Sequence, residues 1–289
     1  MGWTQFDRQY RFTAGGFEIG YTSPEQPMAT RINFSVEKAD TETPNTSRIS
    51  LWNLNPEHLA VLNEKDCLVT LRAGYGDRMP LLFVGTVTFI STELDGANRQ
   101  TDMEVVDGRV TLRDTFVTVS YSGLISSEKI IQDMAAQMGV PVDFSYNAEF
   151  YTFPNGFSCV GSARTALDKA CASSGLQWQI QNGILQIRMR QDVMSREVFV
   201  LSPDSGLIGV PKKVMISPGG VTIDSTGKGA KDLPGYEVEY FLNGVIGIGD
   251  YIRLESKAAT GYYFLHSVEM IGDNYEGDWL CRARILEAR

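Results

Sequence analysis

The stretch Arg48–Val87, RISLWNLNPEHLAVLNEKDCLVTLRAGYGDRMPLLFVGTV, decides the fold. Asn55 and Pro56 are typical of a helix N-terminus, because asparagine is a favoured N-cap and the first helical turn tolerates proline. The segments Leu68–Leu71 and Leu81–Val87 are rich in apolar and β-branched residues, which is typical of strands. The stretch therefore predicts a strand, a short helix and two strands around a Gly-rich loop. No catalytic side chain stands out in it.

The composition is that of a globular protein large enough to bury a core. The chain has 289 residues, of which 43% are hydrophobic and 21% are charged, so two or three domains are expected. The formal net charge of −9 argues against a general nucleic-acid binder, because phosphate binding requires clustered lysine and arginine. We expect no signal peptide and no membrane segment, since no apolar run approaches the roughly 20 residues of a membrane span.

The cysteines have no close-spaced pair. They are Cys67, Cys159, Cys171 and Cys281. This spacing favours small buried hydrophobic side chains in a reducing cytosol over disulfides.

Residues 1–122 predict a first β domain. A hairpin is expected across Gly15-Gly16, and alternation in Ile32–Ala39 predicts a strand with one buried face. Val110–Tyr121 is expected to be a further strand, with Phe116 among its inward residues. Many strands joined by short turns favour a barrel or a sandwich.

Residues 123–190 predict a small α/β domain, because the apolar period changes there from two to 3.6. Ser126 or Ser127 is expected to cap one helix and Gly139 to end it. Ser162 and Gly175 repeat this pattern 36 residues later. Two copies of such a helix-strand unit are too few for a solenoid.

Residues 191–289 predict a return to β structure. The expected strands include Val245–Glu255, Tyr262–Ile271 and Trp279–Ile285, and Asp224–Gly235 is expected to be a mobile loop. The predicted fold is thus mainly β, with two β-barrel domains (1–122 and 191–289) that flank the α/β domain.

No motif carries convincing chemistry. GFSCV at 156–160 lacks the second glycine of a nucleophile elbow, and TGKGAK at 226–231 lacks the residues of a phosphate-binding loop. GVIGIGD at 244–250 fits a turn that starts a strand. His58 and His266, the two histidines, are interpreted as non-catalytic, and no zinc or calcium spacing is present. We therefore predict a non-enzyme with no catalytic, cofactor or metal residues and no cofactor.

The order of several weak motifs resembles the tail hub (baseplate hub) proteins of contractile-tailed bacteriophages and related injection systems. They are RISLWNLN, PEHLAVLN, DCLVTLRAGYGD and LLFVGTV in the first β domain, SSEKIIQDMAAQMGVPV in the middle, and GIGDYIRLESKAATGYYFLHSVEMIGDNYEGDWLCRARI near the end. The resemblance covers most of the chain, without the added lysozyme or peptidase domains of larger hubs. It implies tube-like β-barrel domains and a virion location in the tail baseplate, after synthesis in the host cytoplasm.

The resemblance further implies a homotrimer that adapts a hexameric tail tube to a trimeric central spike and contacts other baseplate proteins. The stretches that begin at Asp66 and Asp250 are rough copies about 184 residues apart. Three chains with two similar barrels each would present six quasi-equivalent units. The acidic balance would let genomic DNA slide through the lumen without specific binding.

Two alternatives stay open. One is a tail-tip binding module that contacts the host surface or other baseplate proteins, and the other is a small hydrolase whose site cannot be read from sequence. The partner-binding residues cannot be predicted, because strand edges that pair with a neighbour look like ordinary strands.

Overall fold

The computed structural model describes residues 7–20, 30–41, 43–108, 114–189, 192, 194, 197–217 and 232–287. The chain divides into two compact units. The first unit combines Met1–Asp40, Asn45–Val106 and Glu197–Arg289, and the second combines Thr41–Pro44 and Asp107–Arg196. Both ends of the sequence therefore contribute to the first unit.

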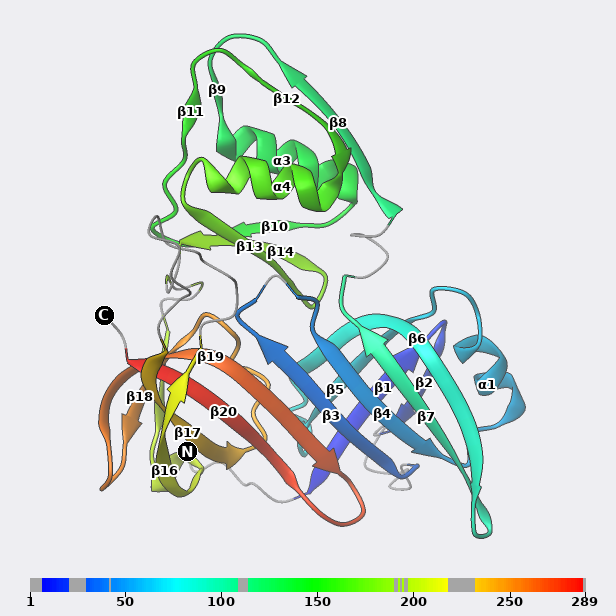
Figure 1. The fold of residues 1–289 in the computed structure, drawn as a ribbon. Helices are drawn as coiled ribbons and strands as arrows, with labels where there is room; N and C mark the ends of the chain where they lie inside the picture. The colour runs from blue at the N-terminus through cyan, green and yellow to red at the C-terminus, as the bar shows by residue number, and fades with distance from the viewer. Residues whose placement is uncertain are drawn as a thin grey trace. The chain divides into compact units, whose positions relative to one another are not determined.

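One large and almost wholly antiparallel sheet forms the first unit (Figure 1). Its N-terminal half contains α1 (Pro56–Leu62) and seven strands: β1 (Arg8–Ala14), β2 (Phe17–Gly20), β3 (Ile32–Ala39), β4 (Thr46–Trp52), β5 (Leu68–Tyr75), β6 (Leu81–Asp95) and β7 (Asn98–Val106). Its C-terminal half contains η1 (Pro203–Ser205) and six strands: β15 (Val198–Leu201), β16 (Leu207–Ile216), β17 (Leu233–Phe241), β18 (Tyr251–Glu255), β19 (Thr260–Asp273) and β20 (Trp279–Glu287). The described strands do not close into a barrel.

The two halves follow the same strand order. The N-terminal half runs β1-β5-β6-β7-β4-β3, and the C-terminal half runs β15-β18-β19-β20-β17-β16. Each has a β-bulge at the same place: between Val87 and Phe89 of β6, opposite β7, and between Leu265 and Ser267 of β19, opposite β20. The halves differ in one pairing, because β1 is antiparallel to β5 whereas β15 is parallel to β18. The shared strand order and the bulge together show which residue of one half is structurally equivalent to which residue of the other.

Alternating apolar side chains from both halves form one continuous core. Phe34 of β3, Leu71 of β5 and Leu265 of β19 are at most 1% exposed. Burial of such a side chain contributes about 1.5–3 kcal/mol. The helix α1 begins as predicted: the Asn55 side chain accepts a hydrogen bond from the His58 N–H, and Pro56 occupies the first turn.

The second unit places two helices between a β-ribbon and a small sheet (Figure 1). Its elements are β8 (Phe116–Tyr121), β9 (Ile125–Ser126), α3 (Ser127–Met138), β10 (Val142–Phe144), β11 (Thr152–Phe153), β12 (Phe157–Ser162), α4 (Ala163–Ala172), β13 (Leu176–Gln181) and β14 (Ile184–Met189). The predicted caps Ser126, Ser162 and Gly139 are confirmed, since the two serine side chains accept backbone N–H bonds and Gly139 adopts the left-handed conformation. The predicted end of the second helix at Gly175 is two residues late, because α4 has Ser173 as its C-cap.

The prediction of a mainly β chain is confirmed. The inward position of Phe116 is wrong: its side chain is 66% exposed, because β8 turns Val117 and Val119 towards the helices. The strand predicted from residue 245 begins only at Tyr251, because Gly247–Asp250 form a turn. Within the predicted loop 224–235, residues 224–231 lie outside the described residues, and those from Leu233 belong to β17.

The three-domain division stays a prediction. The boundary between the two compact units falls at Asp107, so β8 belongs to the second unit. That strand pairs with β12 along its whole length.

Candidate functional site

The two halves of the first unit join where β3 pairs with β19. The register runs from Asn33 opposite Asp273 to Ala39 opposite Ser267. Before its bulge, β19 pairs on this side with β18, and after the bulge it pairs with β3. At the bulge, therefore, the pairing partner of β19 on this side changes from a strand of the C-terminal half to a strand of the N-terminal half.

A glycine makes room for this junction. A Cβ atom at Gly272 would lie 2.2 Å from Cζ of Phe34 and 2.9 Å from the Trp279 ring. The Phe34 and Trp279 rings meet edge to face with centroids 5.4 Å apart, which is a favourable geometry. The Trp279 Nε1–H donates to the Gly74 carbonyl at 3.2 Å, so β20 is also tied to β5.

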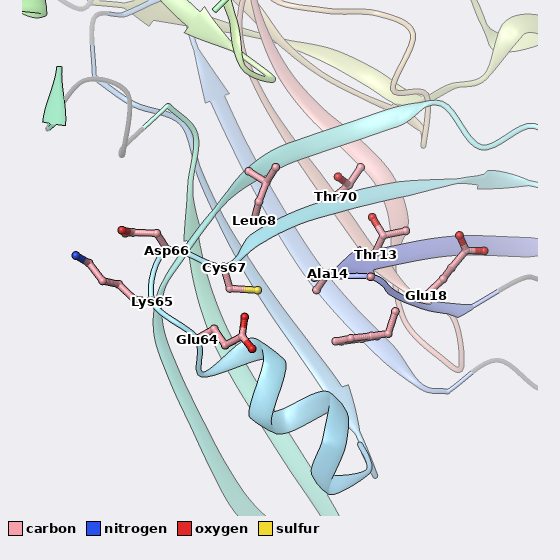
Figure 2. Close-up of a pocket in the computed structure, with 12 residues that line it drawn as sticks. Thr13, Ala14, Glu18, Glu64, Lys65, Asp66, Cys67, Leu68 and Thr70 are labelled. Carbon is pink, nitrogen blue, oxygen red and sulfur yellow. The ribbon is translucent and has the colours of Figure 1, made fainter. Parts of the chain in front are cut away.

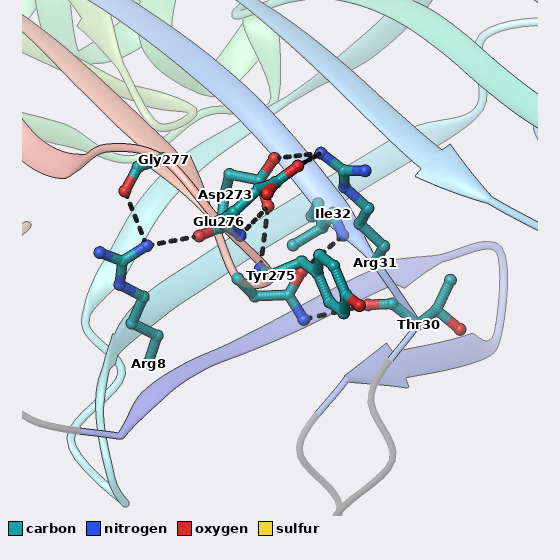
Figure 3. Close-up of polar contacts among 9 residues, drawn as sticks. Arg8, Thr30, Arg31, Ile32, Asp273, Tyr275, Glu276 and Gly277 are labelled. Atoms are coloured by element: carbon teal, nitrogen blue, oxygen red, sulfur yellow. Dashed lines mark hydrogen bonds and ion pairs between the residues drawn. The ribbon is translucent and has the colours of Figure 1, made fainter.

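A polar cluster holds the hairpin between β19 and β20 against the N-terminal half (Figure 3). We call this cluster the clasp; its members are Arg8, Thr30, Arg31, Ile32, Asp273, Asn274, Tyr275, Glu276 and Gly277. Arg31 Nη2 donates to Asp273 Oδ2 at 2.9 Å. The other oxygen, Oδ1, accepts the N–H groups of Tyr275 and Glu276 at 2.8 and 3.1 Å.

These bonds determine the charge state of Asp273. Burial alone would raise its pKa, but the hydrogen bonds from Arg31, Glu276 and Tyr275 together outweigh burial and lower the pKa below the usual range. Asp273 is therefore ionised at neutral pH, and its carboxylate organises the hairpin loop.

Further main-chain bonds complete the clasp. Asn274 Oδ1 accepts the Ile32 N–H at 2.8 Å, and its Nδ2 donates to the Thr30 carbonyl at 3.3 Å. Arg8 donates from Nη1 to the carbonyls of Asp273 and Gly277, both at 2.9 Å. Residues more than 240 positions apart in the sequence thus form one rigid corner.

Aromatic rings cover the Arg31 guanidinium. Its Cζ lies 4.6 Å from the Trp52 ring centroid and 5.5 Å from that of Tyr275. Trp52 is 9% exposed, whereas Tyr275 is 77% exposed. Such stacking contributes about 0.5–1 kcal/mol at an exposed site.

A carboxyl group is buried at the start of β18. Asp250 is 8% exposed, and its Oδ2 accepts the Gly247 N–H at 2.8 Å. Burial raises the pKa of Asp250 to about 6; the bond from Gly247 opposes this rise, and the charge of Glu197 adds to it. Asp66, its counterpart in the sequence echo, is only half-buried.

An open groove lies between the β1–β2 turn and the segment that joins α1 to β5 (Figure 2). Its volume is about 610 Å³, and Glu18, Glu64, Asp66 and Cys67 are among its lining residues. Burial and the charge of Glu64 raise the pKa of the Cys67 thiol. The thiol is therefore protonated at neutral pH and a poor nucleophile.

Within the described part of the chain, the sequence candidates do not come together as a catalytic constellation. His58 stacks on Phe17 with centroids 4.1 Å apart, and His266 lies in the β19 bulge. Ser158 of GFSCV lies on β12, and GVIGIGD forms the expected turn into β18. TGKGAK lies outside the described residues.

All four cysteines are buried, as predicted. Among the described residues, no group of three or more His, Cys, Asp or Glu side chains could hold a metal ion. No helix in the described part of the chain is long and apolar enough to cross a membrane.

Sequence reasoning missed the junction and the clasp. The only local signal was Gly272-Asp273 followed by Trp279, which was one element of the family resemblance. Nothing in that stretch indicates that Arg8 or Arg31 would bind it.

No protein-family model and no curated protein matches the chain in sequence. Among the solved structures that share its fold are three of similar strand arrangement along nearly the whole of this chain. The 43 kDa tail protein of prophage MuSo2 from Shewanella oneidensis has a TM-score of 0.66 at 10% identity, over 97% of both chains. The tail protein from Neisseria meningitidis MC58 has a TM-score of 0.62 at 10% identity, over 98% of this chain and 97% of that one.

The third structure is the E. coli c3393 protein, described as a component of the type VI secretion system with structural similarity to the T4 bacteriophage tail proteins gp27 and gp5. Its TM-score is 0.60 at 8% identity, over 96% of this chain and 77% of that chain. The resemblance inferred from the sequence is thus confirmed at the level of the fold.

Proposed function

We propose that this chain, which has the fold of phage tail proteins, is a structural hub of a tail baseplate. Three copies form a ring that adapts a hexameric tail tube to a trimeric central spike and leaves a channel for DNA. The repeated strand order of the two halves is the observation that carries this proposal. Three chains with two such tube-like halves each supply six similar units, which is what a three-fold object needs to meet a six-fold one.

The clasp supports this role physically. A ring of six similar units requires the two halves of each chain to keep one relative orientation. The β3–β19 pairing, the Phe34–Trp279 contact and the bonds of Asp273 and Asn274 hold that orientation within the first unit. The proposal assigns no catalytic residue, and the DNA in the lumen is not bound specifically.

A density map of the intact tail tests the proposal. We expect a ring of three copies between tube and spike. Absence of the chain from that position would reject the hub. A chain found instead at the tail tip, in contact with the host surface, would support the binding-module alternative.

A further inference from the structure

We propose that neighbouring copies join by pairing β6 of one copy with β16 of the next, in the same register that joins β19 to β3 within each chain. This inference rests on the proposed ring and names the contact that builds it. It follows from three observations on the described strands: the edge that β6 leaves unpaired after its bulge, the matching open edge of β16, and the side chains that those two edges carry.

The first observation is that β6 has an edge unpaired by any described strand, whereas the corresponding edge of its counterpart β19 pairs with β3. After its bulge, β19 pairs with β20 on one side and with β3 on the other. Strand β6 matches β19 in position and bulge, yet its residues from Phe89 to Asp95 pair only with β7. Among the described residues, no strand covers the edge that corresponds to the β19–β3 contact.

The second observation is that β16 is the strand that should cover this edge. In the shared strand order, β16 occupies the place of β3. It pairs with β17 alone, so its other edge is open among the described strands. The two edges lie on opposite sides of the first unit (Figure 1), so they can meet only between different copies.

The shared strand order also predicts the register. The internal pairs Ser267–Ala39, Val268–Lys38, Glu269–Glu37, Met270–Val36 and Ile271–Ser35 translate into Phe89–Ile216, Ile90–Met215, Ser91–Val214, Thr92–Lys213 and Glu93–Lys212. The pairing ends at the β16 bulge, which contains Pro211 and therefore lacks one N–H donor.

The third observation is that the side chains in this register are complementary. Apolar residues meet apolar residues at Phe89–Ile216 and Ile90–Met215, and the Glu93 carboxylate meets the Lys212 ammonium. Phe89 is 56% and Met215 is 62% exposed in the single chain. A slip by one residue would turn the side chains of β16 to the opposite face. It would also place either Pro211 opposite Glu93 or Ser217 opposite Phe89, so one of the three matches would be lost.

The chemistry of the β16 edge limits uncontrolled pairing of a single copy. Lysines and a bulge are common devices that protect an edge strand from uncontrolled pairing. Lys212 holds Glu237 only at 4.0 Å, and its side chain is 70% exposed, so it can turn to Glu93 of a neighbour. The contact is head-to-tail, which closes into a ring when the rotation between copies allows it.

Cysteine cross-linking tests the register directly. Under mild oxidation we expect Ser91→Cys/Val214→Cys to form covalent multimers, because directly opposed strand residues lie within disulfide reach. The matched control is Glu37→Cys/Glu269→Cys, the same position of the internal junction, which should cross-link within one chain. Ser91→Cys/Val210→Cys, out of register, should stay monomeric, like each single variant.

A charge exchange provides the second readout. Glu93→Lys and Lys212→Glu should each weaken self-association, measured by sedimentation, by at least about tenfold, and the double exchange should restore it. Both residues are exposed, so folding should not change. Monomers from the in-register pair, in a protein whose internal control pair cross-links, would overturn the proposal.

The outcomes also separate this inference from the proposed function. Cross-linking should be performed on the purified chain at its highest soluble concentration and on assembled tails. A ring of three copies in the tail without the 91–214 cross-link would reject the strand pairing and keep the hub. Cross-linked multimers of a chain that is absent from the baseplate would reject the hub and keep the strand pairing.

Discussion

The hairpins β6–β7 and β19–β20 follow the same plan, but one is open and the other is enclosed. At the position where Leu94 of β6 is 78% exposed, β19 carries Gly272, and the Phe34 ring from β3 occupies the space. The β19–β20 hairpin has a longer loop, which the clasp holds. The difference shows that the same strand arrangement can form an internal junction in one half and an exposed edge in the other. A few side chains at the equivalent positions distinguish the two.

The largest effect should come from filling the junction. Gly272→Leu places side-chain atoms where Phe34 and Trp279 already lie, so we expect the free energy of unfolding to fall by about 3 kcal/mol. The reverse change at the matching position, Leu94→Gly, should cost less than about 1 kcal/mol, because that side chain is exposed and only strand propensity is lost. Denaturant titration measures both. Equal losses would show that the junction at Gly272 is no more tightly packed than the exposed edge at Leu94.

The next largest effect should come from Asp273→Ala. It leaves three hydrogen-bond donors without their acceptor, so we expect a loss of about 2–3 kcal/mol. The pKa of Asp273 is lowered in the folded state, so its stabilisation is complete above the unfolded pKa and disappears as the pH falls through the folded value. The difference between the variant and the wild type should therefore shrink below about pH 4.

Asp278→Ala is the matched control for this prediction. Asp278 lies in the same hairpin, but its side chain is 50% exposed and pairs with Arg282 on the surface. Such a pair contributes about 0–1 kcal/mol. A similar loss for both variants would mean that the clasp has no special role.

Local chemistry made most elements of this fold predictable. Asn55-Pro56, Ser126 and Ser162 predicted helix starts because capping depends on residues within one turn. Gly15-Gly16 predicted the β1–β2 hairpin for the same reason. The errors at Phe116 and at residues 245–250 concern which face is buried and where a turn ends, and both are decided by tertiary packing.

The junction could not be predicted, because its partners are far apart in sequence. No local pattern in β3 indicates that it pairs with β19. The echo between the stretches from Asp66 and Asp250 did indicate a duplication, and the repeated strand order now supports it. The open edges became interpretable only when the two halves could be compared residue by residue.

Asp250 differs from the positions above, because its replacement should raise the stability of the protein and not lower it. Its folded pKa of about 6 lies above the unfolded value, so wild-type stability should fall as the pH rises from about 4 to 6. Asp250→Asn keeps an acceptor for the Gly247 N–H and removes the buried charge. We expect a gain of about 1–2 kcal/mol at pH 7 and none at pH 4.

A thermal or denaturant series across this pH range provides the measurement. Asp66→Asn is the control at the echo position, where the side chain is only half-buried, and it should not give the gain in stability expected of Asp250→Asn at pH 7. A loss of stability in Asp250→Asn at pH 7 would show that the carboxylate is stabilising there.

The smallest effect should come from Tyr275→Ala, which removes the aromatic ring and leaves the hydrogen bonds of the clasp in place. The ring lies 5.5 Å from the Arg31 guanidinium and is 77% exposed, so its loss should cost about 0.5 kcal/mol. The Tyr275 backbone N–H still reaches Asp273, so the loop keeps its shape. A loss as large as that of Asp273→Ala would mean that the aromatic cover, and not the carboxylate, holds the two halves together.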